Sequence, residues 1–143
     1  MTNQEINFFF EDIEEFVVDN SIIKWLETST IELLSVFVIN YIFCTDDYLL
    51  AVNKEYLNHD YYTDIITFDN SDMDSGLIES DIFISIDRVR EHANERNISF
   101  KEELCRVLIH GVLHMAKYND KTDVEQLVMT QMEDKYLALH PEL

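Results

Sequence analysis

The sequence predicts a single α+β domain: a mostly four-stranded mixed β-sheet with a buried central helix and outer helices. Its 143 residues, 47% of them hydrophobic, match the size and core content of one domain. β-Favouring apolar runs alternate with helical patterns and then give way to three helices. Two glycines and one proline leave no candidate linker, so residues 1–143 are expected to fold as one domain.

The first half of the chain predicts two strands and two helices. Residues 6–10 (INFFF) form a β-favouring apolar cluster, and residues 21–34 carry apolar side chains at helical spacing. Residues 36–44 are β-branched or aromatic almost throughout, which favours a central strand buried on both faces. Thr45 can then cap a helix that runs to about Leu57.

A β-hairpin is expected next. Residues 65–68 and 77–86 have strand character, and the intervening NSDMDSG consists largely of turn formers.

Three helices are expected to close the chain. Asp87 can cap a short one, Ser99 and Glu102 form a capping box that starts the next, and Thr122 and Glu125 form a second box. The middle helix contains VLIHGVLHMA, which is apolar nearly all round and predicts a helix buried in the centre together with its histidines. The last helix has a one-sided stripe that predicts an outer layer, packed through Val124, Leu127, Val128, Met132, Tyr136 and Leu139.

Charge and terminal sequence restrict the function classes. The 29 acidic and 10 basic side chains give a net charge of -19, which counts against nonspecific nucleic-acid binding but not against a local metal-centred site. The N-terminus lacks a signal-peptide pattern, and no apolar run approaches the ~20 residues that span a bilayer, so a soluble cytoplasmic protein is expected. Cys44 and Cys105 are expected to be reduced core thiols, and His92 and His140 to be solvated.

The chemistry is expected to centre on the middle helix. His110 and His114 are four residues apart and project from the same helical face, the separation two imidazoles need to share a metal. Asp120 can join them only if the chain leaves the helix near Lys117 and folds back, because six further helical residues would rise roughly 9 Å. The capping box at Thr122 independently requires such a break.

The alternative is a pair of core histidines hydrogen-bonded within the protein. Two buried imidazoles without a common partner are costly, whereas a dication would supply one. Three protein ligands leave the fourth position for water, which is typical of catalytic zinc. The spacing also matches metzincin peptidases, but Gly111 stands where those need a glutamate base, so a peptidase is disfavoured. Gly111 is instead expected to allow close approach of another backbone.

Three segments of the chain resemble one known family. IHGVLHMAKYND resembles the signature H-G-x-L-H-x-x-G-Y-D-H of the YbeY family of bacterial endoribonucleases. VNKEYLNHDYYTDIITFD is similar to that family's segment from L-N-x-x-Y through T-D/N-V-L-S-F, and SDIFISIDRV is similar to its G-D-I-x-I-S strand. Together these segments span about Asn53 to Lys121 in the family's order.

The resemblance implies a zinc-dependent, single-strand endoribonuclease. It implies a role in ribosomal RNA maturation, at the 3′ end of the small-subunit RNA, and in ribosome quality control, with ribosomal RNA and ribosomal proteins as partners. His110 and His114 match the first two metal ligands of one zinc ion per chain, and Asp120 occupies the third position, where the family usually has histidine. Two histidines with one carboxylate form an established type of catalytic zinc site.

Two matched positions depart from the family pattern, and two others have more than one possible role. Lys117 stands at the signature glycine, which costs roughly 1 to 2 kcal/mol if that residue needs a positive φ. Leu57 stands where the family usually has an arginine, a residue suited to holding phosphate. Asp64 and Asp81 could orient an imidazole or the attacking water from behind the metal ligands. Equally, Asp64 could be a turn former and Asp81 an outward strand residue.

Two rival functions stay open at this stage. One is a metal hydrolase of a small or peptide substrate. The other is a ribosome-associated assembly factor whose metal mainly holds the helix and the following turn together. The sequence does not indicate an oligomeric state.

Overall fold

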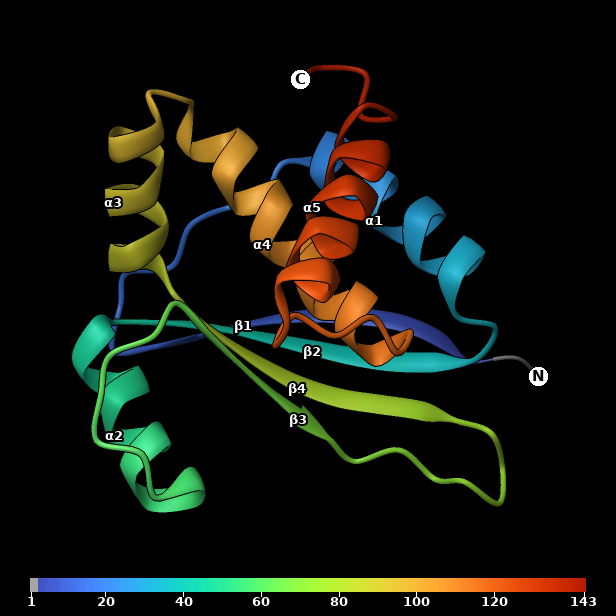
Figure 1. The fold of residues 1–143 in the computed structure, drawn as a ribbon, viewed down its shortest axis with the longest axis horizontal. Coiled ribbons are helices and arrows are strands. Elements are labelled where there is room, and N and C mark those ends of the chain that lie inside the picture. The colour runs from blue at the N-terminus through green and yellow to red at the C-terminus, as the bar shows by residue number, and fades with distance from the viewer. Residues whose placement is uncertain (1–2) are drawn as a thin grey trace.

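The computed structural model describes residues 3–143 and contains one sheet and five helices within that range (Figure 1). In chain order the elements are β1 (Gln4–Glu11), α1 (Asn20–Leu33), β2 (Phe37–Cys44), α2 (Asp46–Leu57), β3 (Ile65–Asp69), β4 (Ile78–Ser85), α3 (Ile86–Arg96), α4 (Phe100–Met115) and α5 (Asp123–Leu137).

The sheet is four-stranded and mixed, as predicted. Its strand order is β1-β2-β4-β3. β1 and β2, and β2 and β4, pair in parallel, whereas β3 and β4 form the expected antiparallel hairpin. β2 therefore lies inside the sheet with a parallel neighbour on each side.

The two faces of the sheet are covered unequally. In Figure 1, α4 lies across one face with α1, α3 and α5 around it, while α2 lies alone on the other side. Ile39 and Tyr41 of β2 are fully buried on the α4 side. The side chains that alternate with them on the other face, Val38, Asn40 and Ile42, are only partly buried. The prediction that β2 is buried on both faces is thus correct for one face only, because α2 covers the other only in part.

A row of polar side chains crosses the partly covered face. The Asn7 amide donates to Asn40, and the Asn40 amide donates to Asp81. Asn70, just beyond β3, donates to the second oxygen of Asp81. Side-chain hydrogen bonds therefore link β1, β2, β4 and the end of β3.

α4 is the central helix that the sequence predicts. The Tyr41 hydroxyl donates to the carbonyl of Leu108 and ties the helix to β2. Cys44 and Cys105 are free and buried, in agreement with the expected reduced thiols. Gly111 does permit a close approach, but by a side chain rather than by a backbone: a Cβ at this position would lie 2.8 Å from Cδ1 of Ile82.

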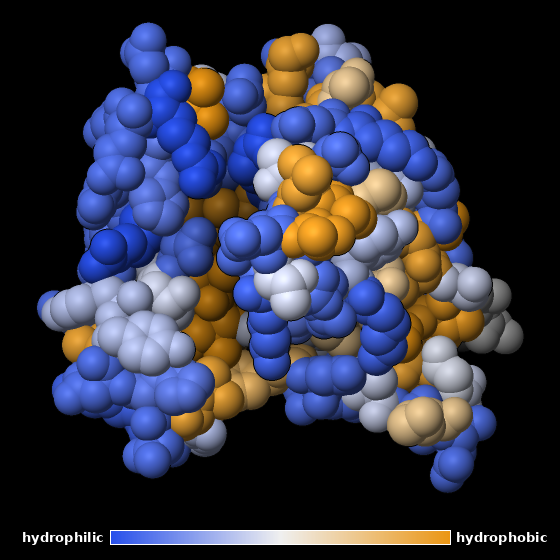
Figure 2. Space-filling view, in the orientation of Figure 1, coloured by the Kyte–Doolittle hydropathy of each residue, from blue (hydrophilic) through white to orange (hydrophobic). Residues whose placement is uncertain are grey.

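The predicted packing face of α5 is correct in part: Tyr136 is buried and Met132 packs against the core, whereas the other stripe residues are exposed. Val124, Leu127 and Val128 are 71%, 59% and 38% exposed, and Figure 2 shows orange side chains surrounded by blue on the outer side of the molecule over α5. The buried residues of α5 are Met129, Glu133, Tyr136 and Leu137. The rest of the predicted stripe is exposed because the charged Glu133 lies on the buried face, where Arg106 and His110 of α4 satisfy it.

Several smaller expectations also change. His140 is buried against Trp25, with ring centroids 5.4 Å apart, and is not solvated. His92 is half-buried. Ser85, rather than Asp87, caps α3, because its side chain accepts from the Arg88 N–H. No helix within residues 3–143 is long and apolar enough to span a membrane.

Candidate metal centre

The chain reverses at the end of α4. Lys117 has φ +77°, in the left-handed region that the family's glycine would adopt without strain. The Lys117 N–H donates to the His114 carbonyl and the Tyr118 N–H donates to the Leu113 carbonyl, the two bonds of a Schellman motif. The predicted break near Lys117 is therefore present, with the strained lysine that the sequence implied.

The reversal returns Asp120 to the helix it has just left. Oδ2 of Asp120 lies 3.4 Å from Nε2 of His110. Thr122 and Glu125 then form the predicted capping box that starts α5. The 3.4 Å between Asp120 Oδ2 and His110 Nε2 is longer than an ordinary N–H···O hydrogen bond of about 2.9 Å. It equals the separation of about 3.4 Å between a nitrogen and an oxygen ligand on one tetrahedral zinc, given metal–ligand distances of about 2.1 Å.

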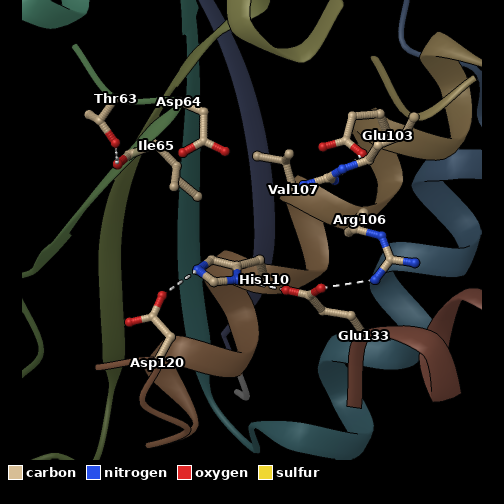
Figure 3. A pocket seen from close by; sticks show the side chains of 10 residues that line it. Thr63, Asp64, Ile65, Glu103, Arg106, Val107, His110, Asp120 and Glu133 are labelled. Atoms are coloured by element: carbon tan, nitrogen blue, oxygen red, sulfur yellow. Dashed lines mark hydrogen bonds and ion pairs between the residues drawn. The ribbon is translucent and has the colours of Figure 1, made fainter. Parts of the chain in front are cut away.

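The other nitrogen of His110 is held by Glu133. Nδ1 of His110 lies 2.7 Å from Oε2 of Glu133, and Oε1 of the same carboxylate accepts from Arg106 at 3.0 Å (Figure 3). Burial disfavours protonation of His110, but the hydrogen bond and charge of Glu133, aided by Asp120, prevail and raise the pKa of His110. Without a metal, the site therefore attracts a positive charge to this imidazole.

His114 does not converge with this pair. It lies one turn further along α4, is half-buried, and lines a separate cavity of about 190 Å³ with Asp69 and Lys117 among others. Between residues 3 and 143, no three His, Cys, Asp or Glu side chains are close enough to hold a metal ion. The expected burial of both histidines is also only partial, because α4 presents this face to a cavity rather than to the core.

The His110 side chain opens into a cavity of about 380 Å³ between β3, α4 and α5 (Figure 3). Its lining includes four carboxylates and two guanidinium groups, contributed by Asp64, Glu103, Asp120, Glu133, Arg96 and Arg106. Counting His110 as neutral, the lining carries two more negative than positive charges, a balance that a dication would neutralise.

The two further predicted carboxylates lie in different places. Asp64 is on the cavity wall, with Oδ2 3.8 Å from Nδ1 of His92 and its carbonyl accepting from the Ser85 N–H. Asp81 is on the opposite face of the sheet, bonded to Asn40 and Asn70. The structure brings Asp64 to the site and does not bring Asp81 there.

Local sequence patterns did not indicate Glu133 or the cavity arginines. Glu133 lies four residues after Met129 and three before Tyr136, on the buried face of α5, but an apolar pattern does not mark a charged residue at such a position. Leu57 ends α2 and brings no guanidinium, but Arg96 and Arg106 line the cavity. Both are already paired with carboxylates, Arg96 with Glu103 and Arg106 with Glu133.

The donor set suits zinc. His110 and Asp120 are spaced as two ligands on one ion, Glu133 holds the imidazole from behind, and His114 projects one turn away on the same helix. Two of the three expected donors, His110 and Asp120, therefore lie together, and His114 would have to move toward them to complete the site.

Known proteins match nearly the whole length of this chain. A family model described as Endoribonuclease YbeY matches residues 4–140. A protein of Cytophaga hutchinsonii named Endoribonuclease YbeY is 49% identical over 141 residues, covering 97% of this chain and 98% of that protein. A protein of the same name from Flavobacterium psychrophilum is 48% identical over 135 residues, covering 94% and 95%.

The fold has a counterpart among solved structures. The solution structure of TM1509 from Thermotoga maritima matches with a TM-score of 0.65 at 26% identity, covering 92% of this chain and 86% of that one. Since the family model extends over nearly all of the chain and curated relatives align over nearly their full length, this chain belongs to the endoribonuclease YbeY family.

Proposed function

We propose that this chain is a zinc-dependent endoribonuclease that cleaves single-stranded RNA, acts on the 3′ end of small-subunit ribosomal RNA and serves ribosome quality control. Two things support the activity: the family, whose curated relatives are named endoribonucleases, and the 3.4 Å between His110 Nε2 and Asp120 Oδ2. The second observation supports the metal part of the proposal, because this spacing matches two ligands of one zinc as well as a direct ion pair.

Each residue has a defined task in this proposal. His110, His114 and Asp120 would hold the ion. Zinc bound there supplies Lewis-acid activation of water and stabilises charge that develops on the phosphate. Asp64, which lies on the cavity wall beside His92, can accept a proton from a water molecule in the cavity. The cavity beside these residues has a volume of about 380 Å³.

The charge of the chain restricts how RNA is chosen. With 29 acidic and 10 basic side chains, few phosphates can be neutralised, and both cavity arginines are engaged by carboxylates. Recognition of a ribosomal substrate would then depend on RNA shape or on a partner such as a ribosomal protein.

A single set of assays separates this proposal from its rivals. The chain is purified without chelator, its metals are quantified, and single-stranded RNA, double-stranded RNA and casein are offered to the wild type and to His114→Ala. Cleavage of single-stranded RNA that is lost in His114→Ala, together with bound zinc, is the expected result. Casein cleavage would indicate a peptidase instead. Bound zinc without any cleavage would indicate an assembly factor whose metal is structural.

A further inference from the structure

We propose that Glu133 is a positioning residue of the metal centre: it fixes the neutral imidazole of His110 in the tautomer whose Nε2 lone pair faces the ion. The expected effect on zinc affinity rests on the proposed zinc function, whereas the effect on the His110 tautomer can be observed in the metal-free protein. Glu133 belongs to none of the segments that resemble the family signature.

The first step is the burial of Glu133. Its side chain is only 10% exposed, and each carboxylate oxygen has its own partner, His110 Nδ1 on one side and Arg106 on the other. A buried carboxylate is costly unless it is paired and hydrogen-bonded. Burying a glutamate at this position of α5 therefore has a desolvation cost that a leucine would not have, and the contacts with His110 and Arg106 offset it.

The second step is the direction of the hydrogen bond. An ionised carboxylate can only accept, so the contact of 2.7 Å requires a proton on Nδ1 of His110. In a neutral ring, Nε2 is then the unprotonated nitrogen and can bind a metal. Nε2 is also the atom that faces Asp120. Glu133 thus orients the imidazole ring, whereas Asp120 would bind the same metal ion as Nε2 of His110.

The third step is the elimination of other carboxylates on the cavity wall. Glu103 is engaged by Arg96 at 2.7 Å, and Asp64 lies beside His92. Neither has a hydrogen bond or ion pair to His110 in Figure 3, where dashed lines join His110 to Glu133, His110 to Asp120, and Glu133 to Arg106. Asp120 faces Nε2 at 3.4 Å, beyond ordinary hydrogen-bond length, so Glu133, at 2.7 Å from Nδ1, is the carboxylate in a position to set the tautomer.

The chain provides a matched control in the next residue. Asp134 accepts from the second terminal nitrogen of Arg106 at 2.8 Å, but its side chain is 60% exposed and it has no contact with His110. Removing Asp134 therefore perturbs the same arginine and the same turn of α5 without touching the imidazole. Any effect that requires contact with His110 must separate the two positions.

The experiment uses Glu133→Ala, the isosteric Glu133→Gln and Asp134→Ala. In metal-free protein at about pH 9, where imidazoles are neutral, nitrogen NMR of His110 should report a proton on Nδ1 in the wild type and in Asp134→Ala. Glu133→Ala should move that proton largely to Nε2. Zinc affinity, measured by chelator competition, should fall about 10- to 100-fold in Glu133→Ala, the usual effect of losing such a partner, and stay within about twofold in Asp134→Ala.

Glu133→Gln keeps the volume and an acceptor oxygen but loses the charge, so its zinc affinity should lie between those of the wild type and Glu133→Ala. It also serves if the alanine variant does not fold, as judged by circular dichroism. An unchanged His110 tautomer in a folded Glu133→Ala protein, or an equal loss of affinity in Asp134→Ala, would overturn the inference. If the wild type binds no zinc, the proposed function fails, while the tautomer of the metal-free protein still tests Glu133.

Discussion

Asp120 Oδ2 lies 3.4 Å from His110 Nε2 although Asp120 is ten positions later in the sequence, because the chain reverses at Lys117. This pairing makes Asp120 the most direct test of the metal centre. Asp120→Ala should weaken zinc binding strongly, whereas Asp120→His should retain it by supplying a nitrogen ligand. Zinc affinities are to be compared by chelator competition. Equal affinities for the two variants would mean that Asp120 is only a turn residue.

Lys117→Gly should stabilise the protein by about 1 kcal/mol, since glycine adopts a positive φ without the penalty that a lysine bears. The lost ion pair with Asp69 is exposed, 4.0 Å long and contributes little. Urea unfolding measures the difference. Lys117→Ala is the control, because it removes the ammonium group but keeps the Cβ, and it should show no such gain. A matching gain in Lys117→Ala would assign the effect to charge rather than backbone strain.

Gly111→Ala should destabilise the fold by about 1 to 3 kcal/mol, the usual cost of overpacking a core. The new methyl group would meet Cδ1 of Ile82, a side chain with no exposed surface. Ile82→Val removes that Cδ1 atom, so the double variant should be more stable than the sum of the two single effects predicts. Thermal unfolding of all four proteins gives the coupling free energy. Strict additivity would show that the contact is relieved elsewhere.

His110 should make the stability of the metal-free protein depend on pH. Burial opposes its protonation, but the hydrogen bond to Glu133 and the charges of Glu133 and Asp120 raise the pKa of His110 above its ordinary value of 6.5. A raised pKa means that the folded state binds the proton more tightly than the unfolded state. The stabilisation is therefore complete below the ordinary pKa and is lost as pH rises through the folded-state pKa.

The measurement is urea unfolding in the presence of chelator at about pH 6 and about pH 8, on either side of the ordinary histidine pKa. The wild type should lose more stability between these two values than His110→Gln, whose side chain does not titrate. An identical pH dependence in both proteins would contradict the raised pKa.

Binding of single-stranded RNA should be weak and should depend only shallowly on salt, because a chain of net charge -19 neutralises few phosphates. The slope of log affinity against log salt concentration is the measurement. A slope that corresponds to many phosphate contacts would reveal a basic RNA groove, which the linear sequence does not indicate.

Local sequence signals were sufficient for most of the secondary structure. The strand predicted at 36–44 is found as Phe37–Cys44, and the hairpin and the capping box at Thr122 are where turn and cap residues indicated. These features depend on neighbours close in sequence, such as an N-cap oxygen or a run of β-branched residues. The chain reversal at Lys117 was also predictable, since the box at Thr122 requires it.

Features that depend on distant partners were not predictable in the same way. Apolar periodicity predicts that Leu127 is buried and Glu133 exposed. The structure has Leu127 exposed and Glu133 buried, because Arg106 and His110 form hydrogen bonds with the buried carboxylate. Asp81 follows a family motif, but its contacts come from Asn40 and Asn70, which no local pattern connects to it. The position of His114, beside the cavity rather than in contact with Asp120, is likewise a matter of side-chain packing.

The polar row across the sheet has a consequence for how the strands align. A slip of one residue would turn apolar side chains to the wrong face, but a slip of two would keep every side chain on its face. Hydrophobic burial alone distinguishes such double slips poorly from the native alignment. Both neighbours of Asn40 on its face of β2, Val38 and Ile42, are apolar. Asn7, Asn40 and Asp81 occupy directly paired positions, and a double slip between β1 and β2 would place Asn7 opposite Val38 or Ile42, which cannot accept its hydrogen bond. The row therefore selects one strand alignment among those that the core alone would tolerate.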